Sequence, residues 1–286
     1  MFKLVNQSNK PLNRDLFITV AGNVGAGKST LTRLVADKLG FESHYEKVDG
    51  NPYLEDFYSD QNSWGFHLQL YFLAQRFKQQ KEIDANGLNN IQDRSIYEDV
   101  EIFARNLYDN GKMSKRDYIT YRDLFNDMVP HLRRPDLMIY LDGSLDTILN
   151  RINLRGREME KSVDIEYWAN LHNRYEKWIS EYDQSPVLYV NINEVDLIKN
   201  PEQLDALCEE IKKSCTSNYF YKIIEELGDV LAKLKKGQFY KVKGEKLLWQ
   251  SEQLLKMATL FLKKYVVLLQ NSMQNWQPCW MIWAKQ

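Results

Sequence analysis

One eight-residue loop constrains the fold of this chain more than any other feature. Residues 22–29 match the pattern G-x-x-x-x-G-K-S in full. The loop follows a short apolar run, Leu16 to Ala21, which predicts a buried strand. It precedes helical spacing from Lys28 to Leu39. A strand, such a loop and a helix in that order form the P-loop of nucleotide-binding proteins, so we expect residues 22–30 to bind nucleotide phosphates.

The chemistry expected of this loop follows from its residue types. Its glycines let successive backbone N–H groups surround the phosphates, Lys28 would neutralise the β- and γ-phosphates, and Ser29 would ligate Mg²⁺. By itself the loop fits GTPases, ATPases and small-molecule kinases alike. The expected phosphate-binding residues are Gly22, Asn23, Val24, Gly25, Ala26, Gly27, Lys28, Ser29 and Thr30.

Strands and helices alternate along the first three quarters of the chain. Further apolar runs predict strands at 90–93, 136–142 and 187–192. Helical patterns cover residues 64–84, 97–110, 115–132, 144–152, 164–183 and 201–213. This alternation predicts an α/β fold with a central, mostly parallel sheet of about five strands flanked by helices, and the loop at residues 22–29 makes it a P-loop fold.

The composition changes near Ser214. Residues 214–286 contain eleven Lys, no Arg, five acidic residues and four of the seven Trp. Helical patterns over about 219–236 and 245–272 predict a separate α-helical extension after a kinase domain of residues 1–213. Glu225, Glu226 and Asp229 resemble half of the metal-binding motif of MazG-type pyrophosphohydrolases, but an amphipathic helical hairpin is the favoured interpretation.

Bulk composition excludes several classes of protein. The formal net charge of −1 argues against nucleic-acid binding, which usually needs a basic excess. The three cysteines show no paired metal-ligand spacing, and an odd number of cysteines does not suit a disulfide framework. Both observations favour a reducing cytoplasm. The N-terminus lacks the apolar core of a signal peptide. The most apolar stretch, Met257 to Leu269, carries two lysines and is too short to span a membrane.

Three further groups of residues suggest transfer of a phosphoryl group. Arg151, Arg155 and Arg157 surround a glycine, which suits a mobile lid over about residues 151–162 that covers ATP and excludes water. Asp93 and Arg94 end a predicted strand, where they could serve Mg²⁺ and phosphate or form a structural salt bridge. Glu46, after a candidate second strand, could act as a general base.

Six segments in order resemble the deoxynucleoside kinase family, in particular the bacterial deoxyadenosine/deoxyguanosine kinases. They are GNVGAGKST, YEKVDGNPYLEDFY, WGFHLQLYFLAQRF, QDRSIYEDVEIFARNLY, RPDLMIYLD and RINLRGRE. The resemblance covers about residues 14–213. It implies ATP as phosphoryl donor, Mg²⁺, a deoxynucleoside acceptor, nucleotide salvage and a homodimer.

The resemblance also assigns roles to individual residues. Glu46 would take the proton from the 5′-hydroxyl, Arg94 would hold that hydroxyl and the incoming phosphoryl group, and Asp93 would assist with Mg²⁺. At the nucleobase and the sugar, the implied contacts are Gln69, the Arg76–Asp99 pair, and Tyr58 with Glu160. The lid arginines are Arg151, Arg155 and Arg157. Trp64 and Phe66 are either aromatic walls of the site or part of the core.

The sequence therefore predicts a kinase that phosphorylates deoxyadenosine or deoxyguanosine, with deoxycytidine as a further candidate. Two alternatives stand beside it. A thymidylate-type monophosphate kinase would need an arginine for the acceptor phosphate and would leave Tyr58 and Glu160 without a role. A P-loop regulator would not need an arginine-rich lid, and the chain has no N-K-x-D motif of the GTPase type.

Overall fold

The computed structural model describes residues 2–5, 15–46, 50–157, 160, 163–215, 241–242 and 245–246. The chain divides into two compact units, Met1–Tyr219 and Phe220–Gln286. The sequence placed the boundary slightly earlier, at Ser214. A helix over residues 201–215 ends the described part of the first unit.

In the second unit, the structure describes a pair of short strands. Strand β7 (Lys241–Val242) pairs antiparallel with β8 (Glu245–Lys246). The predicted helix over 245–272 is therefore wrong at its start, because cross-strand pairing replaces helical hydrogen bonds there. The rest of that range, the predicted helix over 219–236 and the acidic motif at Glu225 lie outside the described residues.

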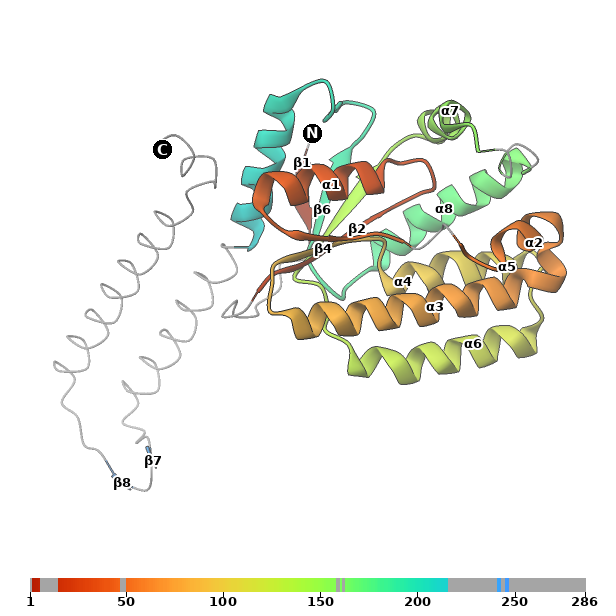
Figure 1. Cartoon of the computed structure of the whole chain (residues 1–286), viewed down its shortest axis with the longest axis horizontal. Helices are drawn as coiled ribbons and strands as arrows, with labels where there is room; N and C mark the ends of the chain where they lie inside the picture. Colours follow the sequence, from red (N-terminus) through yellow and green to blue (C-terminus); the bar gives the residue numbers. More distant parts are fainter. Residues whose placement is uncertain are drawn as a thin grey trace. The chain divides into compact units, whose positions relative to one another are not determined.

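The first unit is built on a six-stranded sheet (Figure 1). Its strands, in spatial order, are β1 (Phe2–Val5), β6 (Val187–Asn191), β5 (Leu137–Asp142), β2 (Phe17–Gly22), β4 (Asn90–Asp93) and β3 (Glu42–His44). All neighbours pair in parallel except β1, which runs antiparallel to β6 at one edge. The mostly parallel sheet is as expected; β1 is an additional strand that the sequence analysis did not predict.

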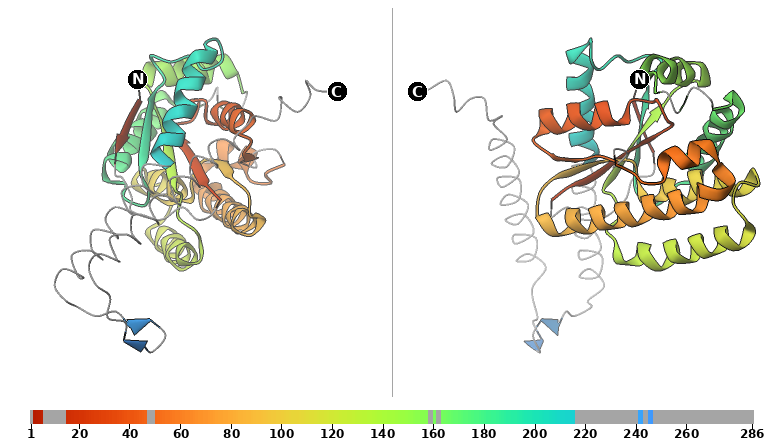
Figure 2. Two further views of the ribbon diagram at one scale, coloured as in Figure 1. Left: turned by 90° about the vertical axis from the view of Figure 1, so that its left-hand side faces the viewer. Right: turned by 45° about the vertical axis from the view of Figure 1, so that its right-hand side comes forward.

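Helices cover both faces of this sheet (Figures 1 and 2). Helix α1 (Lys28–Leu39) and the helix over 201–215 lie on one face. On the other face lie α3 (Gln61–Asn86), α4 (Ile96–Glu98) and α8 (Ile165–Glu181), with α6 (Lys115–Met128) packed outside α3. The remaining helices are α2 (Leu54–Ser59), α5 (Arg105–Asp109), η2 (Val129–His131) and α7 (Leu145–Arg155). Parallel strands require such crossovers, and their right-handedness determines which face each helix covers.

The predicted helix over 97–110 is interrupted by a wider turn. Between α4 and α5 the chain forms a π-helix, η1 (Asp99–Ala104). Such turns are rare and often occur at functional sites, because they change the direction of neighbouring side chains. Here the turn carries Asp99 and Phe103, and both side chains line a cavity described below.

The core fixes where a ligand can bind. Strand β2 is buried along its whole length, and β2, β3 and β4 all end at the same edge of the sheet. In open parallel sheets, ligands bind beyond the carboxyl ends of the strands. No helix among the described residues is both long and apolar enough to cross a membrane.

Candidate active site

The P-loop connects the end of β2 to the first turn of α1. Gly25 and Gly27 have φ angles of 82° and 97°, in the left-handed region that favours glycine. A Cβ atom on Gly25 would come within 2.8 Å of Ile152 Cγ1. At Gly25, both the backbone conformation and the close approach of α7 therefore require glycine.

Lys28 turns back onto the loop that precedes it. Its Nζ atom donates hydrogen bonds of 2.9 Å to the carbonyl oxygens of Gly22 and Asn23. Burial, together with the charge of Arg94, lowers the pKa of Lys28 to about 8. An anion placed against this ammonium would favour its charged form. The site is thus prepared for a phosphate.

Ser29 and Asp93 are held together beside the loop. The Ser29 hydroxyl donates to Oδ2 of Asp93, which is the last residue of β4. A hydroxyl and a carboxylate are suitable oxygen ligands for Mg²⁺, which typically takes one or two protein ligands and completes its shell with phosphate and water. Among the residues that the structure describes, no three His, Cys, Asp or Glu side chains gather as a metal site. The pair therefore fits a nucleotide-bound Mg²⁺ better than a metal held by protein alone.

Glu46 lies between two buried guanidinium groups. Its Oε1 atom is 2.8 Å from Nη2 of Arg76 and 3.0 Å from Nε of Arg94. Burial alone would raise the pKa of Glu46, but Arg94, Arg76 and Lys28 outweigh it and lower that pKa below its ordinary value. For Arg94, burial acts to lower the pKa, but Glu46, Tyr175, Glu98 and Asp93 together outweigh it and the pKa is raised. Glu46 is therefore an ionised carboxylate that can accept a proton.

The Arg76–Asp99 pair joins α3 to the π-helical turn. Nε of Arg76 donates to Oδ2 of Asp99 at 2.7 Å, and Nη1 donates to the carbonyl oxygens of Asp93 and Arg94, each at 3.2 Å. Burial raises the pKa of Asp99 to about 6, against the opposing effect of Arg76. Gln69, two turns earlier on α3, is also buried and lines the same cavity as Asp99.

The lid side of the site carries a second ion-pair cluster. Glu160 is buried; Nη2 of Arg155 lies 2.7 Å and 2.6 Å from its two carboxylate oxygens, and Nη1 of Arg157 lies 3.6 Å from Oε1. Tyr58, from α2, lines the same cavity. Burial and the charge of Glu160 raise the pKa of Tyr58 to about 12, so its hydroxyl stays protonated at neutral pH.

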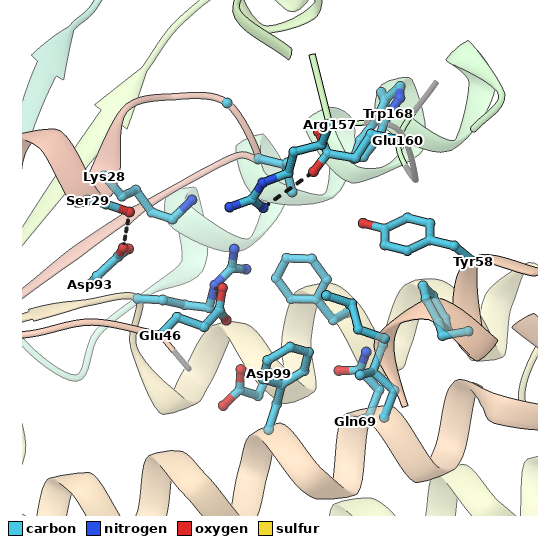
Figure 3. Close-up of a pocket in the computed structure, with 18 of the residues that line it drawn as sticks. Lys28, Ser29, Glu46, Tyr58, Gln69, Asp93, Asp99, Arg157, Glu160 and Trp168 are labelled. Atoms are coloured by element: carbon cyan, nitrogen blue, oxygen red, sulfur yellow. Dashed lines mark hydrogen bonds and ion pairs between the residues drawn. The ribbon is translucent and has the colours of Figure 1, made fainter. Parts of the chain in front are cut away.

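These groups enclose one cavity of about 240 Å³ (Figure 3). Lys28 and Ser29 lie at one end and Tyr58 and Gln69 at the other, with Glu46 between them. The cavity also has apolar and aromatic walls that were not predicted: Leu54, Phe57, Leu68, Phe72, Phe103, Tyr167 and Trp168. One signal for them was available, because Leu68 and Gln69 lie four and three residues before Phe72 and therefore share one face of the predicted helix.

Outside the P-loop, four of the residues considered in the sequence do not line this cavity. One is Arg76, which is buried and connects to the cavity through its ion pairs with Glu46 and Asp99. Arg151, separate from the other two lid arginines, donates to the carbonyl oxygens of Ala26 at 2.8 Å and Ile192 at 3.2 Å, and lines a second hollow with Thr30. Trp64 and Phe66 do not line the first cavity; they are half-buried and pack against the core. Their interpretation as core residues is the one that the structure supports.

Comparison with known proteins identifies the family. The family model described as deoxynucleoside kinase matches residues 18–216. The chain belongs to the deoxynucleoside kinase family. The deoxyadenosine/deoxycytidine kinase of Bacillus subtilis (strain 168) is 52% identical over 200 residues, covering 69% of this chain and 92% of the relative. A deoxyguanosine kinase of Lactobacillus johnsonii is 37% identical, over 68% of this chain and 90% of the relative.

Solved structures agree with this membership. A deoxyadenosine kinase from M. mycoides with bound dATP is 35% identical and superposes with a TM-score of 0.62, covering 69% of this chain and all of the other. The expected α/β P-loop kinase fold is thus confirmed. As a deoxynucleoside kinase, the enzyme transfers phosphate from ATP to a nucleoside hydroxyl, which sets aside the monophosphate kinase and the regulator.

Proposed function

We propose that this kinase phosphorylates the 5′-hydroxyl of deoxyadenosine and, second to it, of deoxycytidine. The observation that carries the proposal is the position of Gln69 and Asp99 in one apolar-walled cavity, with Gln69 at the end away from Lys28 and Ser29. An amide offers one donor group and one acceptor, and an ionised carboxylate offers acceptors only.

The edges of the nucleobases explain this preference. Adenine and cytosine both present an exocyclic amino group beside an unprotonated ring nitrogen, whereas thymine presents carbonyl groups beside a ring N–H. The amide of Gln69 matches the donor–acceptor pair, and Asp99 supplies a further acceptor for an amino group. Arg76 holds Asp99 in place through its 2.7 Å hydrogen bond. The name and the 52% identity of the Bacillus subtilis relative support the same two nucleosides.

The proposed reaction is an in-line transfer. The carboxylate of Glu46 takes the proton of the 5′-hydroxyl as its oxygen bonds to the γ-phosphorus, and the bond from that phosphorus to the bridging oxygen of ADP breaks. Arg94 and Lys28 stabilise the negative charge on the transferring phosphoryl group. Arg155 and Arg157 exchange Glu160 for the phosphoryl oxygens, while Glu160 and Tyr58 bind the 3′-hydroxyl.

The donor nucleotide would extend to the other side of the P-loop. The second hollow, of about 400 Å³, has apolar walls that include Leu34, Leu141 and Val195, with Arg151 beside them. Apolar walls suit the flat base of ATP, and Arg151 would lie at its ribose or phosphates. Ser29 and Asp93 would hold Mg²⁺, which supplies neutralising charge to the β- and γ-phosphates when bound.

The test of this function is a direct comparison of acceptors. The purified chain is incubated with labelled ATP, Mg²⁺ and one nucleoside at a time, and the products are separated by chromatography. We expect 5′-monophosphates with relative kcat/KM values in the order dA, dC, dG, dT. If dG is the best acceptor, the assignment of Gln69 and Asp99 to amino-bearing bases is wrong. Phosphorylation of monophosphates alone would remove the nucleoside as acceptor altogether.

We further propose that the enzyme is a cytoplasmic homodimer that works in nucleotide salvage. Cys208 and Cys215 are free, buried thiols, which supports a reducing compartment. The dimer is the assembly that the family resemblance implies. Size-exclusion chromatography with light scattering checks it: a mass near 68 kDa, twice the 33.9 kDa of the chain, is expected, and a monomer mass contradicts it.

A further inference from the structure

Two fully buried polar side chains, Glu98 and Tyr175, have no part in the reaction described above. Glu98 ends α4 and Tyr175 lies in the middle of α8, and both have 0% exposure. The Tyr175 hydroxyl donates a 2.8 Å hydrogen bond to Oε1 of Glu98. Burying a carboxylate and a phenol so completely costs free energy unless their hydrogen bonds are satisfied, so their partners indicate what they do.

The hydrogen-bond partners of the Glu98 carboxylate, in the part of the chain that the structure describes, are donors. Oε1 accepts from Tyr175 and, at 3.4 Å, from the backbone N–H of Gly22, the first residue of the P-loop. Oε2 accepts from the backbone N–H of Ser95 at 2.7 Å and from its hydroxyl at 3.0 Å. An ionised carboxylate accepts only, so this set of donors fits the ionised form of Glu98. Glu98 therefore connects the P-loop to the residue that follows Arg94.

The orientation of the Tyr175 hydroxyl follows from these contacts. A phenol has one O–H group, and that of Tyr175 donates its hydrogen bond to Glu98. The lone pairs of the Tyr175 oxygen are therefore left to accept from another donor. That donor is Nη1 of Arg94 at 3.3 Å. Burial and the charge of Glu98 raise the pKa of Tyr175 well above its ordinary value, which keeps the hydroxyl protonated. The direction of both hydrogen bonds is thus fixed.

Arg94 itself needs such support. Its φ of 70° makes it the one non-glycine residue with positive φ in the described part of the chain. This conformation is strained for a side chain with a Cβ atom, and it persists where the surroundings enforce it. The guanidinium lies 4.2 Å from the centroid of the Phe103 ring, and its Nε is 3.0 Å from Glu46. Tyr175 holds the other end of the guanidinium.

We propose that Glu98 and Tyr175 are positioning residues for phosphoryl transfer. Glu98 fixes the backbone after Arg94 through its hydrogen bonds with Ser95, and it fixes the side chain of Arg94 through Tyr175. The same carboxylate accepts from the backbone N–H of Gly22. The acceptor side and the donor side of the reaction are thereby placed relative to each other by one buried anion. The proposal depends on the role assigned to Arg94, which the experiment below tests separately.

The main variant is Tyr175→Phe, and Tyr182→Phe is its matched control. Tyr182 is also a buried tyrosine of this region, and its hydroxyl shares a 3.0 Å hydrogen bond with the hydroxyl of Ser185. Losing a hydrogen bond to a charged group that matters in the transition state lowers kcat about ten- to a hundred-fold. We expect that loss for Tyr175→Phe, with the KM values for ATP and nucleoside changed less than about threefold. Tyr182→Phe should keep the turnover of the parent.

Glu98→Gln adds a readout that a purely structural role would not change. Glutamine keeps the size of the side chain but turns one acceptor oxygen into an NH₂ donor, so the Tyr175 hydroxyl or the Ser95 donors lose their partner. The kcat should therefore fall while the KM values for ATP and nucleoside change less than about threefold. The double variant with Tyr175→Phe should lose no more activity than the worse single variant, because both remove one connected unit.

Arg94→Ala separates the two ideas. If Arg94→Ala is inactive while Tyr175→Phe turns over within about threefold of the parent, the connection through Tyr175 is refuted and the role of Arg94 stands. If Arg94→Ala keeps the turnover of the parent, the role of Arg94 fails and the positioning proposal fails with it. Should Glu98→Gln not fold, the Tyr175→Phe and Tyr182→Phe comparison still decides the question.

Discussion

Replacing Glu46 with glutamine is the most direct test of the catalytic arrangement. Glutamine has nearly the same shape, so the cavity is preserved, but its amide cannot accept the proton of a hydroxyl group. Nitrogen atoms of Arg76 and Arg94 lie 2.8 Å and 3.0 Å from Oε1 of Glu46. The change therefore also removes the anion that these two guanidinium groups share. The variant should therefore lose both activity and stability, for different reasons.

The two losses have different magnitudes. Removing a general base typically costs 10²–10⁴-fold in rate, which is about 3–5 kcal/mol of transition-state stabilisation. Breaking a buried ion pair by removing one partner costs about 3–5 kcal/mol of stability, and this is an upper value here because the Glu46 side chain is 19% exposed. A domain is typically stable by about 5–15 kcal/mol, so the variant should remain folded at low temperature.

The assay measures kcat at saturating ATP and deoxyadenosine at low temperature, and urea unfolding gives the stability. Asp136→Asn is the matched control, because Asp136 is a buried carboxylate paired with Arg133 at the other end of the sheet. We expect Asp136→Asn to lose stability but to retain turnover. A folded Glu46→Gln enzyme that turns over within about tenfold of the parent would falsify the role of Glu46 as the base. Equal losses of kcat in both variants would attribute the effect to folding instead.

Three further predictions concern the phosphate and base ends of the site. Because burial lowers the pKa of Lys28 to about 8 in the free enzyme, ATP binding at pH 8 should take up about half a proton, and binding at pH 6.5 almost none. Calorimetry in buffers of different ionisation enthalpy measures this uptake, and equal binding heats in all buffers at pH 8 contradict it. Because the pKa of Asp99 is raised to about 6, kcat/KM for deoxyadenosine should fall as the pH drops below 6. In Asp99→Asn this acid limb should disappear and the plateau should be about ten- to a hundred-fold lower, with the KM for ATP unchanged; an acid limb that persists in the variant assigns it to another group. Gly25→Ala should abolish ATP binding, measured by equilibrium titration, because the new Cβ atom would clash with Ile152. The control Gly111→Ala, at φ 67° and with no atom within 4 Å of the new Cβ, should lose only about 1–2 kcal/mol of stability. Normal ATP affinity in Gly25→Ala would show that the loop can adjust.

Much of the fold follows from local patterns in the sequence. The apolar runs near 17–22, 90–93, 137–142 and 187–191 form strands because their side chains are wholly or largely buried in a mostly parallel sheet covered by helices. The P-loop could be predicted as a whole from the sequence, since its glycines and Lys28 lie within eight consecutive residues. The π-helical turn at Asp99–Ala104 was not predicted, because periodicity does not distinguish it from the α-helix around it.

The active site depends on contacts that no local pattern contains. Arg76, Asp99 and Glu46 come from three segments and meet only in the folded chain, so family resemblance alone suggested their grouping. The aromatic walls were missed for the same reason: Phe103 and Trp168 look like core residues until the cavity beside them is known. Trp64 and Phe66 sit on the same helix as Gln69 but outside the cavity lining, and side-chain direction on a helix decides between the two positions.

The pairing of Arg155 with Glu160 bears on how fast the lid can work. A guanidinium group that is fully hydrated in the open lid would have to be desolvated each time it binds the phosphoryl group. Here the guanidinium already pairs with Glu160, whose side chain is 3% exposed, while the Arg155 side chain itself is 33% exposed. In the proposed closing, Arg155 exchanges one anion for another, so part of its dehydration is completed during folding rather than in each catalytic cycle.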